Sequence, residues 1–321
     1  MELDLQYLLQ QLVNGLSNGM IIALIAIGYT MVYGIIELIN WAHGDLCMLG
    51  AFFALTLIGA LGIEAWAGPM GALGVVLLLL STAAFCGTLN VCVDRVAYRP
   101  LRKAPKLTLL VTAIGVSFIL VNIGLFWGGV PMDVFSGGVA AAAPKNFPSI
   151  VPATPIIGGE PGSVTVTLRD ILIVGVTLPL MAALWWLVRR TKLGKAMRAV
   201  AQNPTAASLM GINTDRVIGA TFFIGGALGG FGSVIYAINN GTIGFQLGYR
   251  AGMDAFTAAV LGGIGSLPGA VLGGILIGVI RALSDGYLEA RWTPTLVFAI
   301  LILILIFRPS GLLGLKAKEK V

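Results

Sequence analysis

Long apolar runs alternate along the chain with shorter polar segments, several of them basic. Runs such as "GMIIALIAIGYTMVYGII" and "TLVFAILILILIF" approach or exceed the roughly 20 apolar residues that a helix needs to cross a bilayer core. Helices are expected, because an open sheet would leave backbone groups unpaired in lipid. The pattern predicts spans over roughly 15–36, 45–62, 69–92, 107–128, 170–188, 217–238 and 294–307, with a glycine-rich region at 251–284.

The composition indicates which class of protein these runs belong to. Of the 321 residues, 57% are hydrophobic and 11% are charged, whereas soluble domains carry about a quarter charged residues. We therefore expect an all-α, polytopic transmembrane helical bundle of about eight or nine spans. The start "MELDLQYLLQQ" lacks the basic residues of a secretory signal, so the first span should be retained. The chain is predicted to be a single transmembrane domain over 1–321.

The glycine-rich region at 251–284 is interrupted by Pro268 and could form two spans or a re-entrant pair of half-helices. Small residues recurring every four positions let another helix approach closely. This spacing marks candidate packing faces at Gly225 and Gly229, and at Gly265, Gly269 and Gly273. These faces are either statically packed or slide during transport.

Charge orients the spans. Most of the 20 Lys and Arg residues lie in three segments, 94–106, 189–216 and the tail from 308. The positive-inside rule places these segments in the cytoplasm. The loop at about 129–167, poor in Lys and Arg, falls outside, so the N-terminus is predicted outside and the C-terminus in the cytoplasm.

The same distribution argues against several other functions. Loop topology accounts for the net charge of +6, and no binding motif accompanies it, so nucleic acid is not an expected partner. Cys47, Cys86 and Cys92 lie in apolar runs, which predicts neither a disulfide framework nor a Cys-ligated metal. No nucleophile-and-base motif or phosphate-binding loop is present in the sequence. We expect no enzyme activity and no cofactor, and any ATP hydrolysis must occur on another subunit.

Polar residues at the junction of the first two spans are candidates for a substrate pathway. Asn40, His43 and Asp45 fall in "ELINWAHGDLCMLG", and Asp254 begins the glycine-rich region in the same manner. An ionisable group in a membrane span is costly unless it pairs or faces water. The alternative is that Asp45 caps the second helix, with Gly44 supplying the turn.

The stretch Arg189–Arg216 is polar, basic and about as long as a span. It contains signals for a short, separately capped helix: Asn203 as N-cap, Pro204 at the first helical position and Gly211 as a left-handed stop. Basic residues, Arg198 among them, precede this helix, and its Ala206 and Ala207 are small enough for a partner to press closely. We expect a short capped helix within a cytoplasmic loop at 189–216.

Four segments in order, "IGYTMVYGIIELINWAHGD", "RVAYRPLR", "LMGINTDRV" and "FTAAVLGGIGSLPGAVLGG", resemble the H-type permeases of branched-chain amino acid ABC importers. The resemblance implies a second, M-type permease, two cytoplasmic ATPases and a periplasmic substrate-binding protein as partners, besides membrane lipid of the bacterial inner membrane. It also implies that 189–216 is a cytoplasmic coupling loop and that 204–210 is its coupling helix, although Thr205 stands where importer loops have Glu.

Two other functions remain open at this stage. Related importers carry other neutral amino acids, amides or urea, and in such systems the binding protein selects the ligand first. A gradient-driven secondary transporter is the third reading, but it would need more acids or bases deep in the spans than this sequence offers.

Overall fold

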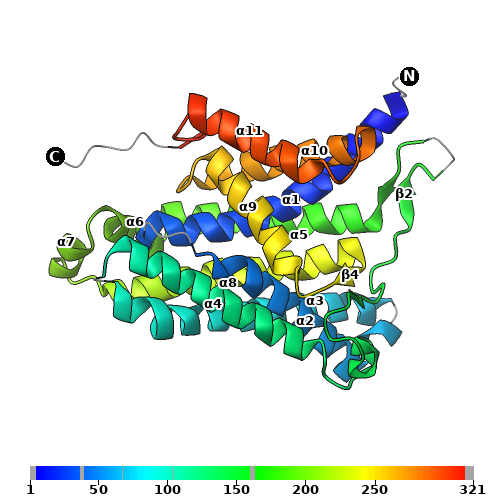
Figure 1. Ribbon diagram of the computed structural model, residues 1–321, viewed down its shortest axis with the longest axis horizontal. Helices are drawn as coiled ribbons and strands as arrows, with labels where there is room; N and C mark the ends of the chain where they lie inside the picture. Colours follow the sequence, from blue (N-terminus) through cyan, green and yellow to red (C-terminus); the bar gives the residue numbers. More distant parts are fainter. Residues whose placement is uncertain (1–4, 37–39, 67, 103, 160–162, 315–321) are drawn as a thin grey trace. The chain divides into compact units, whose positions relative to one another are not determined.

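The computed structural model describes residues 5–36, 40–66, 68–102, 104–159 and 163–314. Most of these residues are helical, and the few strands are short (Figure 1). In chain order the elements are α1 (Leu5–Ile36), α2 (Ala42–Leu61), η1 (Ile63–Ala65), α3 (Pro69–Val93), the π-helical η2 (Asp94–Tyr98), η3 (Arg99–Leu101), α4 (Lys106–Trp127), η4 (Asp133–Gly138), β1 (Lys145–Asn146), β2 (Pro155–Ile157), β3 (Val166–Thr167), α5 (Leu168–Arg190), α6 (Lys192–Gln202), α7 (Pro204–Leu209), α8 (Thr214–Asn240), β4 (Thr242–Ile243), α9 (Leu247–Gly262), α10 (Leu267–Tyr287) and α11 (Thr293–Phe307).

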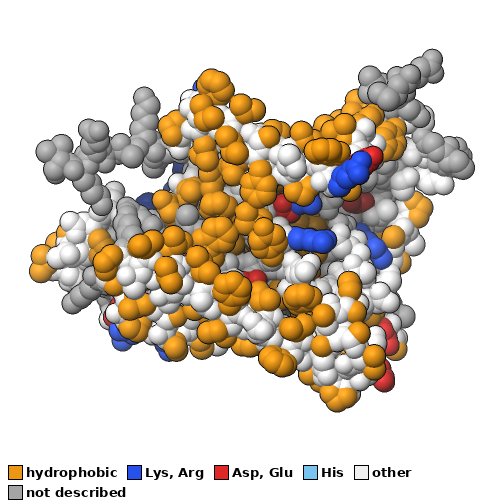
Figure 2. Space-filling model, in the orientation of Figure 1, with side chains coloured by type: hydrophobic (Ala, Val, Ile, Leu, Met, Phe, Trp, Pro, Cys, Tyr) orange, Lys and Arg blue, Asp and Glu red, His pale blue; other side chains and the backbone are white. Residues whose placement is uncertain are grey.

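Seven helices in the described part of the chain are long and apolar enough to cross a membrane, and α11 is a shorter apolar helix. Large apolar side chains remain exposed along them, as with Phe118 (66%) and Phe126 (77%) on α4. Hydrophobic side chains likewise cover much of the face seen in Figure 2. Such a surface is unsuited to water and suited to lipid. The prediction of an all-α polytopic membrane protein is confirmed.

The chain divides into two compact units, each assembled from separate stretches of sequence. Unit 1 contains Met1–Thr30, Pro152–Ala183 and Asp254–Val321, and unit 2 contains Met31–Val151 and Leu184–Met253. Three of the four boundaries fall within α1, α5 and α9, and the fourth falls in the loop between β1 and β2.

Unit 2 is built around α8, which packs against α2 and α3. Glycines allow the close contact with α3, because a Cβ on Gly226 would lie 2.5 Å from the Cys86 carbonyl oxygen and one on Gly230 would lie 2.7 Å from that of Thr82. Gly225 is buried on the same helix. The predicted face at Gly229 turns toward α2, where a Cβ would lie 3.0 Å from the Cys47 sulfur.

Lys145 holds together the first part of the loop between α4 and α5, which belongs to unit 2. β1 pairs antiparallel with β4, with Lys145 opposite Ile243. The Lys145 side chain is buried, and its ammonium group donates to the carbonyl oxygens of Phe135 (3.1 Å), Val139 (3.2 Å) and Ala140 (3.1 Å). Three acceptors satisfy the donors of the buried ammonium group.

Unit 1 brings the first helix against α10, and glycines on both sides make the contact. A Cβ on Gly278 would lie 2.3 Å from the Cα of Gly19, and a Cβ on Gly15 would lie 2.8 Å from the Cα of Val279. Any larger residue at these positions would collide with backbone, so α1 and α10 touch main chain to main chain.

The glycine-rich region forms α9 and α10, which are separated by a turn at 263–266. Gly269 and Gly273 face α9, since a Cβ on Gly273 would lie 2.0 Å from the Ala258 carbonyl oxygen. Gly265 does not share this face: it lies in the turn with a φ of 91° and an open surrounding, so the prediction of one helix face through 265, 269 and 273 is wrong at its first member. α9 has 16 residues and α10 has 21, so by length α10 can cross a bilayer whereas α9 falls short.

α1 begins at Leu5, ten residues before the predicted start at 15. The polar side chains of this first segment misled the prediction. Gln10 accepts from the backbone N–H of Thr165 (2.7 Å) and donates to its carbonyl oxygen (3.1 Å), both within unit 1. The hairpin of β2 and β3 thus supplies the partners that a glutamine needs on an otherwise apolar helix.

Candidate functional site

Three of the predicted pathway residues lie together in unit 2, at the start of α2. Asn40, His43 and Asp45 are 2%, 0% and 3% exposed. α2 begins at Ala42 with Trp41 as N-cap and no side-chain cap, so Asp45 lies inside the first turn of the helix. The alternative that Asp45 caps this helix is therefore wrong.

Hydrogen bonds fix Asn40 in the interior of unit 2. The Tyr98 hydroxyl donates to its side-chain oxygen (2.7 Å), and its amide nitrogen lies 3.4 Å from the side-chain oxygen of Asn90. Asn90 in turn donates to the carbonyl oxygen of Phe222 on α8 (2.7 Å). Sequence reasoning missed Asn90 and Tyr98, although a lone Asn inside the apolar run "STAAFCGTLNVCV" was a usable signal.

Asp45 and His43 extend this group toward α4, α8 and α9. The Ser117 hydroxyl donates to Asp45 at 2.5 Å. A Cβ on Gly248 would lie 2.5 Å from the other Asp45 carboxylate oxygen, and a Cβ on Gly229 would lie 3.4 Å from Cε1 of the His43 ring. A carboxylate with few fixed donors in an apolar setting is suited to accept hydrogen bonds from a cationic or hydroxyl group.

The neighbours of this group show where it lies along the long helices. Asn90 lies well inside the continuous helical segment Pro69–Leu101, which has 33 residues. Gly229, beside His43, lies near the centre of α8, which has 27 residues. The polar start of α2 therefore contacts two long apolar helices at positions away from their ends. Transporter sites are commonly built near the middle of the spans, where a helix is interrupted.

Asp254 belongs to unit 1, whereas the group at the start of α2 belongs to unit 2. Its carboxylate forms an ion pair with Arg281 of α10, and the two side chains are 19% and 31% exposed. Arg281 was missed by sequence reasoning, although a single Arg within "GGILIGVIRALSDG" stood out from its apolar neighbours.

The loop between α5 and α8 contains the short capped helix that the sequence predicted. α7 begins after Asn203, whose side-chain oxygen accepts from the N–H of Ala206 (3.0 Å), and Pro204 occupies its first turn. The helix ends at Leu209 with Met210 as its C-cap, and Gly211 follows in the left-handed conformation with a φ of 82°. The N–H groups of Gly211 and Ile212 bond back to the carbonyls of Ser208 and Ala207, which is the Schellman arrangement. The predicted boundaries are confirmed.

The two alanines of α7 face different surroundings. Ala206 is exposed, but Ala207 is 4% exposed and packs within unit 2. Beside them, Leu209 and Met210 are 83% and 82% exposed. The sequence interpretation that both alanines are open to a partner is wrong for Ala207, and the open apolar surface lies at the end of the helix. Arg198 on α6 donates to the Val188 carbonyl oxygen, so it ties α6 to the end of α5.

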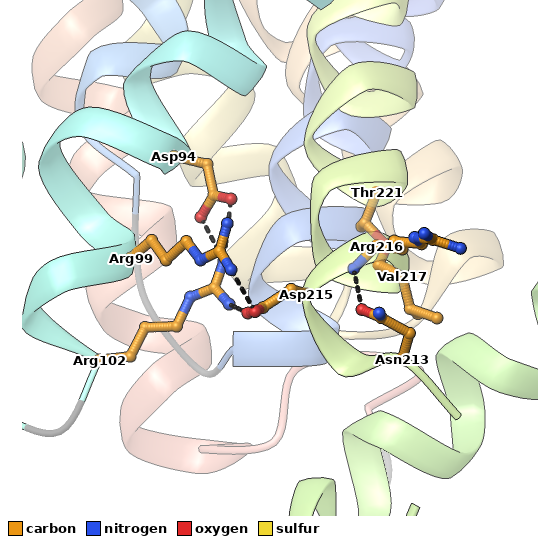
Figure 3. A network of polar contacts seen from close by, with 8 residues as sticks. All are labelled: Asp94, Arg99, Arg102, Asn213, Asp215, Arg216, Val217 and Thr221. Atoms are coloured by element: carbon orange, nitrogen blue, oxygen red, sulfur yellow. Dashed lines mark hydrogen bonds and ion pairs between the residues drawn. The ribbon is translucent and has the colours of Figure 1, made fainter. Parts of the chain in front are cut away.

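Charged side chains connect this loop to the one between α3 and α4 (Figure 3). Asp215, at the start of α8, accepts from Arg99 at 2.5 Å and from Arg102 at 2.8 Å. Arg102 also donates to both carboxylate oxygens of Asp94, at 2.7 and 2.8 Å. Asp94 is 3% exposed, whereas Asp215 is 44% exposed. The four residues, here named the loop network, join the two basic loops, and sequence reasoning did not pair them.

The protein is thus a polytopic α-helical membrane protein with a group of polar side chains buried among its apolar helices. The family model for the branched-chain amino acid transport system permease component matches residues 11–306, and the chain belongs to this family. The resemblance seen in the sequence is confirmed.

Individual relatives agree with the family. The chain is 42% identical over 326 residues to the high-affinity branched-chain amino acid transport system permease protein LivH of Salmonella typhimurium, covering 98% of each chain. It is 40% identical to the corresponding protein BraD of Pseudomonas aeruginosa, covering 99% of each. It is also 26% identical to the autoinducer 2 import system permease protein LsrC of Escherichia coli, covering 95% of this chain and 81% of that one. No solved structure matches the chain.

Proposed function

We propose that the protein is the permease subunit of an ATP-driven importer that moves branched-chain amino acids into the cytoplasm by alternating access. The observation that carries the proposal is the full-length similarity to permeases named for this transport. The chain would act as one permease domain in the bacterial inner membrane, with its N-terminus outside and its C-terminus in the cytoplasm. Its partners would be an M-type permease, two cytoplasmic ATPases and a periplasmic binding protein.

Uptake into proteoliposomes that contain the whole complex tests this function. With loaded binding protein on one side and ATP on the other, labelled leucine, isoleucine or valine should accumulate. Depletion of ATP should abolish the uptake, and a protonophore should leave it unchanged. Loss of uptake with the protonophore alone would instead indicate a gradient-driven transporter.

A second candidate substrate class is other neutral amino acids, amides or urea. The similarity to a permease named for autoinducer 2 import supports considering this second class, because permeases of related sequence serve different ligands. Competition by unlabelled glutamine, acetamide or urea against leucine uptake separates the two classes. Inhibition by leucine, isoleucine and valine alone supports the branched-chain assignment.

The coupling role of the loop at 189–216 is supported by the exposed end of α7. Leu209 and Met210 are large apolar side chains exposed in a loop that is predicted from its charge to be cytoplasmic. Such side chains act as anchors when they enter a pocket of a partner. In this arrangement Asn203, Pro204 and Gly211 hold the helix in shape, Ala206 lets the partner approach, and Arg198 and Ala207 fix the helix to its own unit.

A charge at Leu209 tests the coupling role. Leu209→Glu should weaken attachment of the ATPase by about 2 kcal/mol or more, roughly thirtyfold, because a carboxylate would replace an apolar anchor. The measurement is the ATPase content of the purified complex, together with ATP turnover stimulated by loaded binding protein. Val139→Glu is the matched control, since Val139 is 73% exposed in the outer loop. Normal ATPase content and stimulation in Leu209→Glu would refute this role.

A further inference from the structure

The ion pair of Asp254 and Arg281 lies between two helices of unit 1 that are otherwise rich in glycine and apolar residues. Charged side chains in such surroundings are costly and in membrane proteins commonly mark a substrate path. We propose that this pair binds the ammonium and carboxylate groups of the transported α-amino acid. The inference rests on the proposed function and names the residues that would recognise the substrate main chain.

The chemistry of the pair matches a zwitterion. The Arg281 guanidinium offers a planar set of donors that suits a carboxylate, and the Asp254 carboxylate accepts from an ammonium group. Without substrate each side chain neutralises the other. An arriving amino acid would exchange one ion pair for two, so the net charge of the site stays the same, and Asp254 and Arg281 each keep a partner of opposite charge.

A further carboxylate stands beside the pair. Asp285 lies one turn after Arg281 on α10, which is the spacing at which side chains of a helix are neighbours. The Thr293 hydroxyl contacts Asp285 and also lies 2.8 Å from the Ser284 hydroxyl. Two carboxylates, Asp254 and the exposed Asp285, thus lie near the one guanidinium of Arg281, a balance that favours a ligand carrying an ammonium group over a simple anion.

The backbone around Arg281 is held without help from the ion pair. A Cβ on Gly278 would lie 2.3 Å from the Cα of Gly19 on α1, and a Cβ on Gly273 would lie 2.0 Å from the Ala258 carbonyl oxygen on α9. Ser266 caps α10 by accepting from the Gly269 N–H at 3.2 Å. Main-chain packing thus fixes both helices, and a partly buried ion pair adds little net stability to such a contact. The same packing would keep the guanidinium and the carboxylate in place for a ligand.

A neutral pair tests the inference in the assembled importer. The double variant Asp254→Asn, Arg281→Gln removes both charges but leaves a group that can form hydrogen bonds at each position, so the complex should still assemble with its full ATPase content. Leucine uptake should fall at least tenfold. Glu289→Gln with Arg291→Gln is the matched control, because this ion pair of the same unit is mostly exposed, and uptake should not change. Uptake at the wild-type rate in the Asp254 and Arg281 double variant would overturn the inference.

Binding of leucine to the permease–ATPase complex without binding protein gives a second readout. Wild type should bind leucine and should bind leucinamide, which lacks the carboxylate, at least tenfold more weakly. Arg281→Lys keeps the charge but loses the planar set of donors, and it should raise the leucine dissociation constant about tenfold. An unchanged constant in an assembled complex would refute the site. If wild type itself takes up no branched-chain amino acid, the proposed function fails first, which is a different result.

Discussion

The loop network allows a prediction about stability that depends on burial rather than on the number of ion pairs. Arg99 and Arg102 each contact Asp215, but only Arg102 also contacts Asp94. Asp94 is 3% exposed, whereas the side chains of Arg99 and Asp215 are 50% and 44% exposed. We compare Arg99→Gln with Arg102→Gln, because the two changes remove the same charge from neighbouring positions.

The expected magnitudes differ severalfold. Arg99→Gln removes an ion pair that water already screens, which should cost less than about 1 kcal/mol of the free energy of unfolding. Arg102→Gln leaves the buried Asp94 carboxylate without its partner, which should cost about 3–5 kcal/mol. Replacing both partners, in Asp94→Asn with Arg102→Gln, removes the unpaired charge and should recover most of that loss.

The assay is denaturant unfolding of the purified permease in mixed micelles, and a double-mutant cycle isolates the interaction between Asp94 and Arg102. The amount of each variant in cell membranes provides an independent check on the ranking of the variants by stability. Equal losses for Arg99→Gln and Arg102→Gln would refute the reasoning, as would a double variant less stable than Arg102→Gln alone.

Two further predictions concern orientation and the buried polar group. In a background with Cys92→Ser, a membrane-impermeant thiol reagent should label Ala142→Cys in intact cells and should not label Lys192→Cys; labelling of the latter would reverse the topology. Ala142 is chosen because it is exposed, whereas Lys145 in the same loop is buried. Asp45→Asn and His43→Ala should each lower uptake while the complex still assembles, because both residues are expected to border the substrate path. Normal uptake in both variants would leave the group a purely structural role.

The sequence predicted features that depend on local chemistry. Apolar runs of span length located most helices within a few residues, and Asn203, Pro204 and Gly211 located α7, because caps and stops act through neighbouring backbone groups. Even here the local signals did not reveal the inward direction of Ala207, because which face of a two-turn helix is buried depends on α6 and α8.

Features that depend on distant partners were not predictable. Gln10 made the first helix look too polar at its start, since its partner Thr165 lies 155 positions away. The sequence made Asp45 resemble a helix cap. In the structure its carboxylate accepts a hydrogen bond from Ser117, which lies 72 positions further along the chain. The ion pairs of Arg102 with Asp94 and Asp215, and of Asp254 with Arg281, were missed for the same reason. Periodicity within one helix carries no information on which helix lies beside it.

The contact of α1 with α10 imposes an order on how the protein is made. Gly19 and Gly278 meet backbone to backbone, yet roughly 250 residues separate them, which take the ribosome on the order of ten to fifty seconds at about 5–20 residues per second. Until α10 has been made, the first helix must stay inserted while its glycine face, Gly15 and Gly19, is covered by lipid or by the insertion machinery. Unit 2 contains stretches synthesised before and after the middle segment of unit 1. A protein truncated before α10 would therefore present α1 without its packing partner, a state that membrane quality control could recognise.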